Sequence, residues 1–220
     1  MSKRLGKPLP MQKDDDGGKR GYHHGNLREA LIFAAIGLIA DKGLQGFTFA
    51  EAARAAGVSA AAPYRHFRDR DALIAEVARF GFERFADQLE GAWNNGRPEP
   101  LMAFEAVGQA YLKFAREERP LFATMFQSAL PDEPALKAAE DRAFNVLHQA
   151  CLTLANRLPP RQRPPAHMMT YHVWAFSHGI ADLYTVKGLR RSPISADEML
   201  ESGLMLSLIH IRRCRRIRRC

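Results

Sequence analysis

Apolar residues recur along this chain at intervals of three and four positions, the spacing that places them on one face of an α-helix. The first such stripe comprises Leu27, Leu31, Ala34, Leu38 and Ile39. It predicts a first helix, in a region where order is expected to start near Tyr22, with Gly43 as its C-cap. A short helix over about 49–56, a third reaching residue 65 and a long fourth from residue 70 follow. No alternation typical of a strand interrupts residues 22–90.

Residues with capping chemistry stand at the expected starts of these helices. Thr48 and Glu51 match a capping box, in which the hydroxyl and the carboxylate each bind an otherwise unpaired amide. Gly57 supplies the backbone freedom for a tight turn, and Ser59 is expected to be the N-cap of the third helix. Asp69 is expected to cap the fourth. Two short helices joined at Gly57 predict a helix-turn-helix.

Further amphipathic helices are expected after the Asn94–Pro98 break. One stripe comprises Phe104, Val107, Tyr111 and Phe114, and the next comprises Phe144, Leu147, Cys151 and Leu154. Beyond the prolines at 159–165, a third face carries His167, Tyr171, Trp174 and His178. Ser195 and Glu198 form a second capping box ahead of a last helix.

The predicted fold is therefore all-α, with eight to ten helices. Two domains are expected within it, a three-helix helix-turn-helix domain at 22–70 and a larger helical domain at 71–206. Residues 1–21 have no apolar period and are expected to form a flexible arm. Residues 207–220 hold six arginines and no acid. They are either a basic tail that contacts nucleic acid or lipid, or an end that is not native.

Positive charge is concentrated toward the two ends of the sequence. Residues 1–70 hold 12 basic and 7 acidic side chains, whereas residues 71–206 hold 14 and 17. The arginines of the tail bring the net charge to +8. Because a polyanion attracts basic groups that are gathered on one part of a molecule, the N-terminal segment is the candidate for binding DNA.

The composition, with 46% hydrophobic and 25% charged residues, is that of an ordinary globular protein. The longest apolar runs are shorter than the roughly 20 residues that cross a bilayer, and the start lacks the apolar core of a signal peptide. Cys151, Cys214 and Cys220 form neither a CxxC pair nor a zinc-finger spacing. We therefore expect a cytoplasmic protein with no disulfide, metal or cofactor, in which Cys151 packs in the core.

The segment from Thr48 to Ser59, with Pro63-Tyr64-Arg65-His66-Phe67 and Arg70-Asp71-Ala72-Leu73, resembles the DNA-binding domain of the tetracycline-repressor (TetR) family. The resemblance spans roughly residues 22–85. It implies a transcription repressor whose recognition helix enters the major groove of an operator. The side chains expected at the phosphates are Thr48, Tyr64, His66 and Arg70. Phe67 is expected in the core, and Tyr64 has that same alternative.

The recognition helix of the resemblance starts at Ser59 and presents Ala60, Ala61 and Ala62 to the groove. Alanine cannot form a hydrogen bond with a base edge. Our hypothesis is that these methyl groups pack on thymine methyls, and that Arg65 or Tyr64 carries much of the discrimination. DNA shape and the arm contribute the rest, with Lys19, Arg20 and Tyr22 placed to enter the adjacent minor groove.

Trp174 with His178-Gly179 resembles the Trp-His-Gly (WHG) pattern of one C-terminal ligand-domain subtype of the family. The family resemblance implies a homodimer formed by the last two helices, which places two recognition helices about one DNA turn apart on a palindromic operator. It also implies a small-molecule effector whose binding releases DNA. The residues expected to line the effector cavity are Phe104, Tyr111, Phe126, His148, Trp174 and His178, with Tyr111, His148 and His178 as polar anchors.

Two other classes of function were considered. An enzyme would need a metal site built from His167, His172, His178 and Asp182, but the spacing puts His172 off the face that the other two histidines share. No HExxH motif or glycine-rich phosphate loop is present, so no enzyme is expected. An architectural DNA binder would lack a ligand cavity, whereas the roughly 130 residues after the helix-turn-helix exceed what dimerisation needs.

Overall fold

The computed structural model describes residues 27–127, 130–186 and 192–203, and it contains no strand among them. The α-helices are α1 (Leu27–Lys42), α2 (Phe49–Ala55), α3 (Arg70–Trp93), α4 (Pro100–Glu117), α5 (Arg119–Gln127), α6 (Pro134–Asn156) and α7 (Ala166–Ala181). Residues 196–203 form one more helical segment. The short turns are the 3₁₀ helices η1 (Ala62–Arg65), η2 (Asn94–Gly96) and η3 (Pro160–Gln162) and the π-helical η4 (Asp182–Val186). The prediction of an all-α fold is confirmed.

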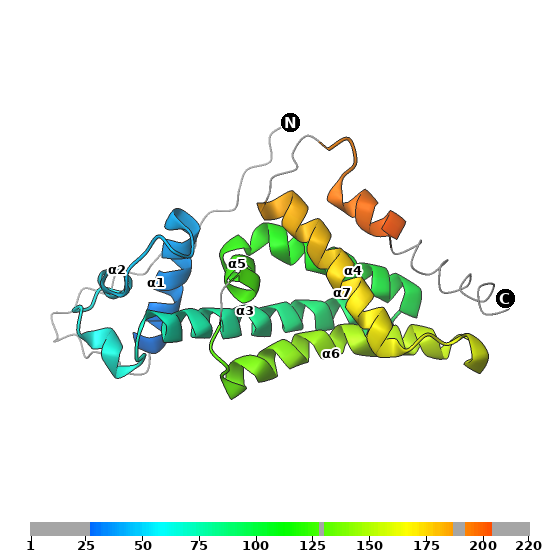
Figure 1. Ribbon diagram of the computed structural model, residues 1–220, viewed down its shortest axis with the longest axis horizontal. Coiled ribbons are helices and arrows are strands. Elements are labelled where there is room, and N and C mark those ends of the chain that lie inside the picture. The colour runs from blue at the N-terminus through cyan, green and yellow to red at the C-terminus, as the bar shows by residue number, and fades with distance from the viewer. Residues whose placement is uncertain (1–26, 128–129, 187–191, 204–220) are drawn as a thin grey trace, which may run out of the picture.

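The 24-residue helix α3 forms the long axis of the molecule, as Figure 1 shows. Helices α1 and α2 and the turn η1 lie at its N-terminal end, whereas α4, α5 and α6 pack along the rest of it. Helix α7 crosses α4 and α6. A single helix therefore joins the N-terminal group of short helices to the larger bundle. No described helix has the length and hydropathy that a membrane span requires.

The core runs without a break from α1 through α3 into α7. On α3, Leu73, Val77 and Phe85 are fully buried, at 0% exposure, and Phe80 is half-buried. On α4, the four members of the expected stripe are 1–2% exposed. Gly81 lies where α5 crosses α3, since a Cβ there would stand 2.8 Å from the sulfur of Met125. The missing side chain allows the two helices to approach closely.

Most of the expected caps and turns are confirmed. The Thr48 hydroxyl accepts a hydrogen bond from the Glu51 amide at 3.2 Å, and the Glu51 carboxylate accepts one from the Thr48 amide at 2.7 Å. Asp69 caps α3 by accepting from the Ala72 amide at 2.8 Å. Gly43 and Gly57 both have positive φ, at 76° and 74°. These are the left-handed positions that favour glycine.

The expected third helix is corrected by the structure. Residues 62–65 form only one 3₁₀ turn, its N-cap is Ala61, and Ser59 makes no side-chain cap. In an α-helix the amide of residue 63 would donate to the Ser59 carbonyl, but Pro63 has no N–H. The Ala62 amide donates to that carbonyl instead, at 3.0 Å, and so closes a tighter turn.

The Thr48 cap is testable on stability alone, without DNA. Removing the hydroxyl in Thr48→Ala leaves the Glu51 amide unpaired, so we expect the free energy of unfolding to fall by about 1 kcal/mol. Urea denaturation followed by circular dichroism measures the change. Thr48→Ser keeps the hydroxyl and should retain most of the stability, so an equal loss in both variants would contradict the capping role.

Candidate functional site

The N-terminal end of the molecule presents the exposed face expected to meet DNA. Five of the expected residues, Ser59, Ala60, Ala61, Tyr64 and Arg65, are exposed together on and just before η1, and Ala62 and His66 are half-buried. Thr48 is also exposed, at the start of α2. The side chains that could reach a groove therefore come from the turn and from α2, the two parts of the helix-turn-helix.

Tyr64 is held in place by a ring contact rather than by burial. It is 63% exposed, and its ring meets that of Phe49 edge to face with centroids 5.0 Å apart. Phe67, three residues on, is 4% exposed, which confirms its core position. Burial thus separates the two aromatic residues into a core residue and a surface residue. The geometry favours the surface role for Tyr64 over the alternative of core packing.

Two further arginines lie on the same end of the molecule, and the sequence reasoning did not select them. Arg54 is exposed in the last turn of α2, and the Arg68 side chain is 85% exposed beside Asp69, with which it pairs at 2.8 Å. Arg54 lies within the segment that carries the family resemblance, and Arg68 lies between its last two parts. The exposure of Arg54 could have been predicted from the helical period, since it falls on the face of α2 opposite the buried Ala52 and Ala53.

Arg70 has a different role in the structure from the phosphate contact that was expected. Its Nε donates to the Phe47 carbonyl at 3.0 Å, and a terminal nitrogen donates to the Leu44 carbonyl. The guanidinium also lies 4.7 Å from the centroid of the Phe47 ring. These contacts tie the loop between α1 and α2 to the first turn of α3. A guanidinium bound to backbone carbonyls has fewer donors left for DNA. The phosphate contact of Arg70 stays a prediction.

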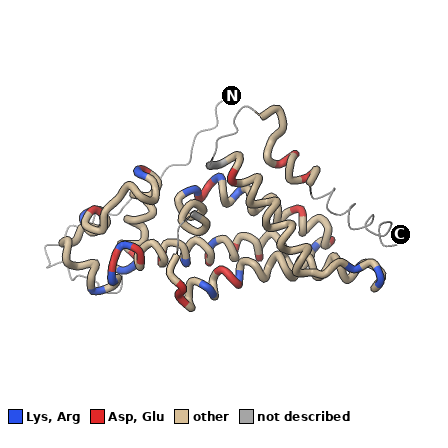
Figure 2. The backbone as a smooth tube through the Cα atoms, in the orientation of Figure 1, with Lys and Arg blue, Asp and Glu red and all other residues tan. Residues whose placement is uncertain are grey.

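The expected arm residues Lys19, Arg20 and Tyr22 lie outside the described residues. Of the 12 basic side chains in residues 1–70, six lie in that same N-terminal segment, at 1–26. Within the described part, basic and acidic residues both occur around α1, α2 and the start of α3, as Figure 2 shows. Much of the positive charge deduced from the sequence is therefore carried by the chain ahead of α1.

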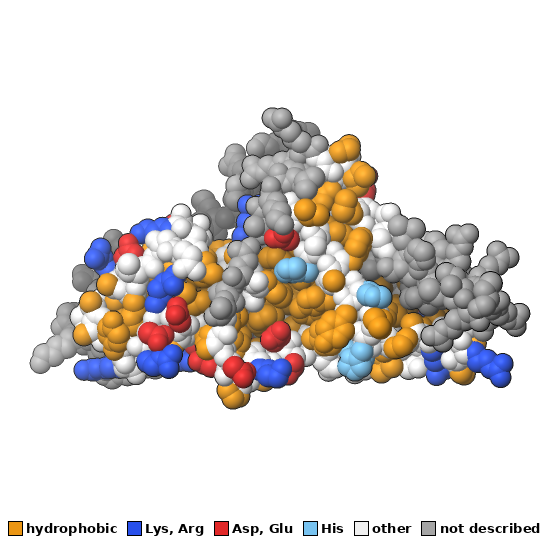
Figure 3. Space-filling model, in the orientation of Figure 1, with side chains coloured by type: hydrophobic (Ala, Val, Ile, Leu, Met, Phe, Trp, Pro, Cys, Tyr) orange, Lys and Arg blue, Asp and Glu red, His pale blue; other side chains and the backbone are white. Residues whose placement is uncertain are grey.

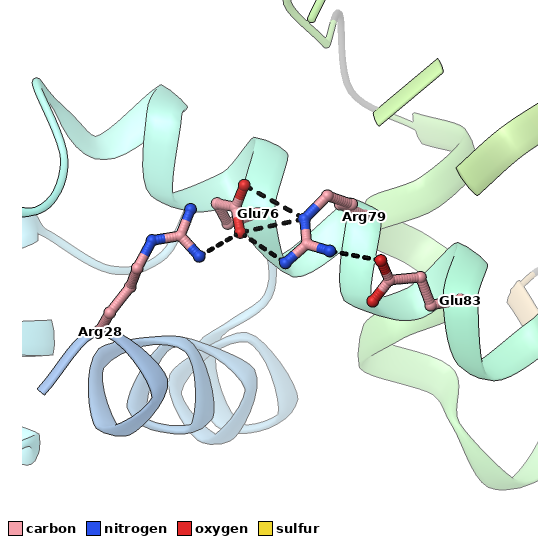
Figure 4. Close-up of polar contacts among 4 residues, drawn as sticks. All are labelled: Arg28, Glu76, Arg79 and Glu83. Atoms are coloured by element: carbon pink, nitrogen blue, oxygen red, sulfur yellow. Dashed lines mark hydrogen bonds and ion pairs between the residues drawn. The ribbon is translucent and has the colours of Figure 1, made fainter. Parts of the chain in front are cut away.

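An ion network connects α1 to α3 (Figure 4). Arg28 on α1 pairs with Glu76 on α3 at 2.8 Å, and Arg79 binds the same carboxylate at 3.0 Å while also reaching Glu83. The Glu76 side chain is only 9% exposed. Burial raises the pKa of Glu76, but the hydrogen bonds from Arg79 and Arg28 lower it by more. The pKa therefore lies below its ordinary value. The carboxylate is therefore ionised at neutral pH and holds α1 against α3.

The two ends of this network should respond differently to mutation. Glu76→Gln leaves Arg28 and Arg79 facing each other without a carboxylate, so we expect the free energy of unfolding to fall by roughly 2 kcal/mol. Arg28→Ala keeps the pair with Arg79 and removes a half-exposed partner, so its cost should stay below about 1 kcal/mol. Urea denaturation at pH 7 measures both. Equal costs for the two variants would show that the carboxylate is not the centre of the network.

Four of the residues expected at the effector site come together in one aromatic cluster. Tyr111, Phe126, Trp174 and His178 contact one another, with Tyr111 and Trp174 centroids 6.0 Å apart and Phe126 and His178 centroids 4.6 Å apart. They come from α4, α5 and α7. Figure 3 shows hydrophobic side chains gathered over the middle of the molecule, where these helices meet. The packing of these helices brings together residues that are up to 67 positions apart in the sequence.

A buried hydrogen bond lies within this aromatic cluster. The Tyr111 hydroxyl and Nδ1 of His178 are 3.0 Å apart, and Tyr111 is 2% exposed. Burial raises the pKa of Tyr111 well above its usual value. Burial lowers the pKa of His178, although Asp182 opposes this shift. A neutral imidazole can then accept a hydrogen bond from the Tyr111 hydroxyl at Nδ1.

The histidine predicts a dependence of stability on pH. Because the pKa of His178 is lower in the folded protein than its ordinary value of 6.5, the unfolded chain binds more protons between those two values. The folded state therefore loses stability as the pH falls below about 6.5, and the stability is complete above it. Melting temperatures from pH 7.5 to 5 measure this loss.

His178→Gln should weaken that dependence, whereas the wild-type slope should persist in His172→Gln, which changes an exposed histidine on the same helix. Some dependence will remain in His178→Gln, since burial also lowers the pKa of His148. A variant slope identical to that of the wild type would rule out His178 as a source of the effect.

Phe104 and Tyr111 line a small cavity beside the aromatic cluster. Its volume is about 10 Å³, close to that of one water molecule, and its walls come from α3, α4, α6 and α7. The lining residues are Leu89, Phe104, Val107, Gly108, Tyr111, Leu147, Val173 and Ser177. Sites for drug-sized ligands measure roughly 300 Å³ or more. In this conformation the cavity is therefore too small for a drug-sized ligand.

His148 lies apart from the other expected effector residues. Its Nδ1 is 3.1 Å from the Thr170 hydroxyl, and its ring stacks on that of His167 at 4.1 Å between centroids. Within the described ranges, no three histidine, cysteine or acidic side chains gather as metal ligands. Cys151 is fully buried, as expected, and burial raises the pKa of its thiol to about 11. The structure divides the expected set into an aromatic cluster, a cavity wall and this histidine pair.

Comparison with known proteins gives two family matches. Residues 31–77 match the model described as bacterial regulatory proteins of the tetR family, and residues 104–206 match the one described as tetracyclin repressor-like, C-terminal domain. The WHG subtype suggested by Trp174 and His178-Gly179 is not confirmed. No curated protein sequence matches this chain.

Several solved structures share the fold. A protein of unknown function from a Rhodococcus species is 28% identical with a TM-score of 0.72, over 89% of this chain and 98% of that one. The TetR family transcriptional regulator PfmR from Thermus thermophilus is 21% identical with a TM-score of 0.62, over 81% and 96%. A TetR-family transcriptional regulator from Bordetella parapertussis is 21% identical with a TM-score of 0.62, over 85% and 95%.

Proposed function

Because this chain belongs to the TetR family of transcriptional regulators, we propose that it represses transcription as a homodimer on a palindromic operator and leaves the DNA when a small-molecule effector binds. Regulators of this family are DNA-binding proteins rather than enzymes. Acting on the bacterial chromosome, the protein would work in the cytoplasm. In this proposal residues 22–70 bind DNA and residues 71–206 bind effector and partner.

The observation that carries the proposal is the exposed face of η1 and α2. It combines small side chains that allow close approach to a groove with exposed side chains suited to phosphates or base edges. Ala60 and Ala61 supply the first property, and Tyr64, Arg65 and Arg54 supply the second. We assign Thr48, Tyr64 and His66 to phosphates, with Arg54 and Arg68 as additional cations at the same end of the molecule.

Sequence discrimination is proposed to come from few groups. The methyl groups of Ala60, Ala61 and Ala62 suit contact with thymine methyls, and Arg65 is the exposed side chain on the turn that can bind guanine at two positions. Ser59 stands beside them with a hydroxyl that can donate or accept. Lys19, Arg20 and Tyr22 are proposed to enter the adjacent minor groove, which would add a preference for DNA shape.

An apolar stripe on α7 supports the proposed homodimer. Met168 and Tyr171 are 56% and 62% exposed, and Ala175 follows on the same face. The segment 196–203 packs against α7, since a Cβ at Gly203 would stand 1.9 Å from the Phe176 ring. Exposed apolar side chains in a row are typical of an interface with another chain. Two such helices per subunit suit the expected association through the last two helices.

The proposed release mechanism requires a connection from the effector site to the DNA-binding end. Helix α3 passes through both, because it carries Leu89 at the cavity and Glu76 at the ion network with α1. Helix α5 carries Phe126 of the aromatic cluster and also packs on α1 and α3. An effector shifts the equilibrium only by its different affinity for the two arrangements, so it must alter the contacts of these helices.

Arg65 tests the DNA-binding surface directly. Arg65→Ala should lower the affinity for an operator upstream of the coding region about fivefold to 150-fold, the effect of losing a bidentate base contact of about 1–3 kcal/mol. Gel shifts at two salt concentrations measure it. Arg161→Ala removes an exposed arginine from η3, far along the chain, and should bind as the wild type does.

Equal affinity of Arg65→Ala and the wild type for the operator would contradict the recognition surface. Binding of the wild type to every DNA sequence with the same affinity would contradict operator recognition as a whole.

A further inference from the structure

The cavity beside the aromatic cluster has walls without formal charge. Its eight lining residues are leucines, valines, a phenylalanine, a tyrosine, a glycine and a serine. Neither a basic nor an acidic side chain is among them. A charged ligand placed there would lose its hydration without gaining an ionic partner, which is costly. The walls therefore favour an uncharged occupant.

Ser177 places a hydroxyl group in these otherwise largely apolar walls. The residue is 2% exposed and belongs to the lining. The hydroxyl of Tyr111, the other polar side chain in the lining, is already bound to His178. A polar group of a ligand placed in an apolar cavity needs a hydrogen-bond partner there, and the Ser177 hydroxyl can supply one. Ser177 can both donate and accept.

Aromatic rings surround the cavity on its α4 side. Phe104 and Tyr111 form part of the wall, and Tyr111 in turn meets Phe85 and Trp174 edge to face at 4.9 and 6.0 Å between centroids. A ring inserted here would contact the rings of Phe104 and Tyr111, and aromatic pairs are more favourable than their buried area alone. This chemistry favours an aromatic ligand over an aliphatic one.

We propose that the effector is a small uncharged aromatic compound with one hydroxyl or carbonyl group, which forms a hydrogen bond with Ser177. This inference rests on the proposed function, since it names the ligand class of the regulatory domain. Leu89 and Val173 line the cavity from α3 and α7 and would contact the ring, and Tyr111 belongs both to the lining and to the aromatic cluster.

Binding requires the cavity to open beyond its present volume of about 10 Å³. Helix α7, which supplies Val173 and Ser177, passes directly into the π-helical turn η4 (Asp182–Val186). Such turns widen the helix by one residue and often lie at functional sites. A shift of α7 at this turn would enlarge the cavity. It would also move His178 relative to Tyr111, so ligand entry is linked to the aromatic cluster.

Isothermal titration calorimetry of the full-length protein with four probes tests the ligand class. Phenol and toluene are uncharged, whereas benzoate and benzylammonium have similar rings with opposite charges. Phenol should bind most tightly, toluene more weakly, and both ions at least tenfold more weakly than phenol. Absence of phenol binding, or binding of either ion as tight as that of phenol, would overturn the proposal.

Two variants locate the site and the hydrogen bond. Ser177→Ala should weaken phenol binding about fivefold to tenfold, the effect of one hydrogen bond, and should leave toluene binding within about twofold. Val173→Phe fills the cavity and should abolish binding of both. Unchanged phenol affinity in Ser177→Ala, or unchanged toluene affinity in Val173→Phe, would exclude this cavity. If Val173→Phe does not fold, the Ser177→Ala comparison still decides.

A gel shift of the wild type without ligand separates this inference from the proposed function. A protein that binds its operator but none of the uncharged probes overturns the ligand class alone. A protein that binds phenol through Ser177 but recognises no operator overturns the proposed function and leaves the ligand class supported.

Discussion

The burial of α3 along almost its whole length is the constraint on which the other elements depend. Twelve of its 24 residues are buried, and they face α1 at one end and α4, α5 and α6 along the rest. Fully burying one large apolar side chain contributes about 1.5–3 kcal/mol, so this helix supplies a large part of the core. Because α3 is packed against other helices at both of its ends, neither group of helices can shift without changing its contacts with α3. Helix α3 thus gives the proposed effector release a continuous packed connection between the two ends.

Polar groups inside this packing are few, and each is placed by specific partners. Glu76 keeps its charge in the core because two arginines bind it, and Tyr111 is matched by His178. Isolated, either group would cost several times the free energy that a satisfied hydrogen bond contributes. Such pairs therefore fix the relative positions of helices more narrowly than apolar contacts do. One pair lies between α1 and α3, and the other lies between α4 and α7.

The sequence predicted the features that depend on local spacing. Helical periodicity located α1, α3, α4, α6 and α7, and capping chemistry located the starts of α2 and α3, because both signals arise within a few residues. Helix α5 was not predicted. The prediction of the third helix was wrong because Pro63 lacks the amide that an α-helix needs there. The hydrogen bonds of Arg70 were not predicted, for another reason. Its partners are carbonyls 23 and 26 positions earlier, and no spacing pattern reports a contact of that range.

The sequence predicted several residues of the candidate sites, but not how these residues are arranged. Aromatic residues at helical spacing identified Tyr111, Trp174 and His178, and the fold gathered them as a cluster. The sequence could not show that His148 would stack on His167 instead, nor that Ser177 would face a cavity. Both depend on the angle at which α7 crosses α4 and α6, which is set by side-chain packing across the bundle.

Basic and acidic side chains surround α1, α2 and the start of α3, whereas hydrophobic side chains gather over the middle of the molecule (Figures 2 and 3). Attraction to a phosphate backbone weakens as ionic strength rises, whereas the transfer of an uncharged ring out of water does not. In the proposed mechanism, operator binding would therefore weaken as the salt concentration in the cell rises, whereas binding of an uncharged effector would not. Less effector would then be needed to release the DNA.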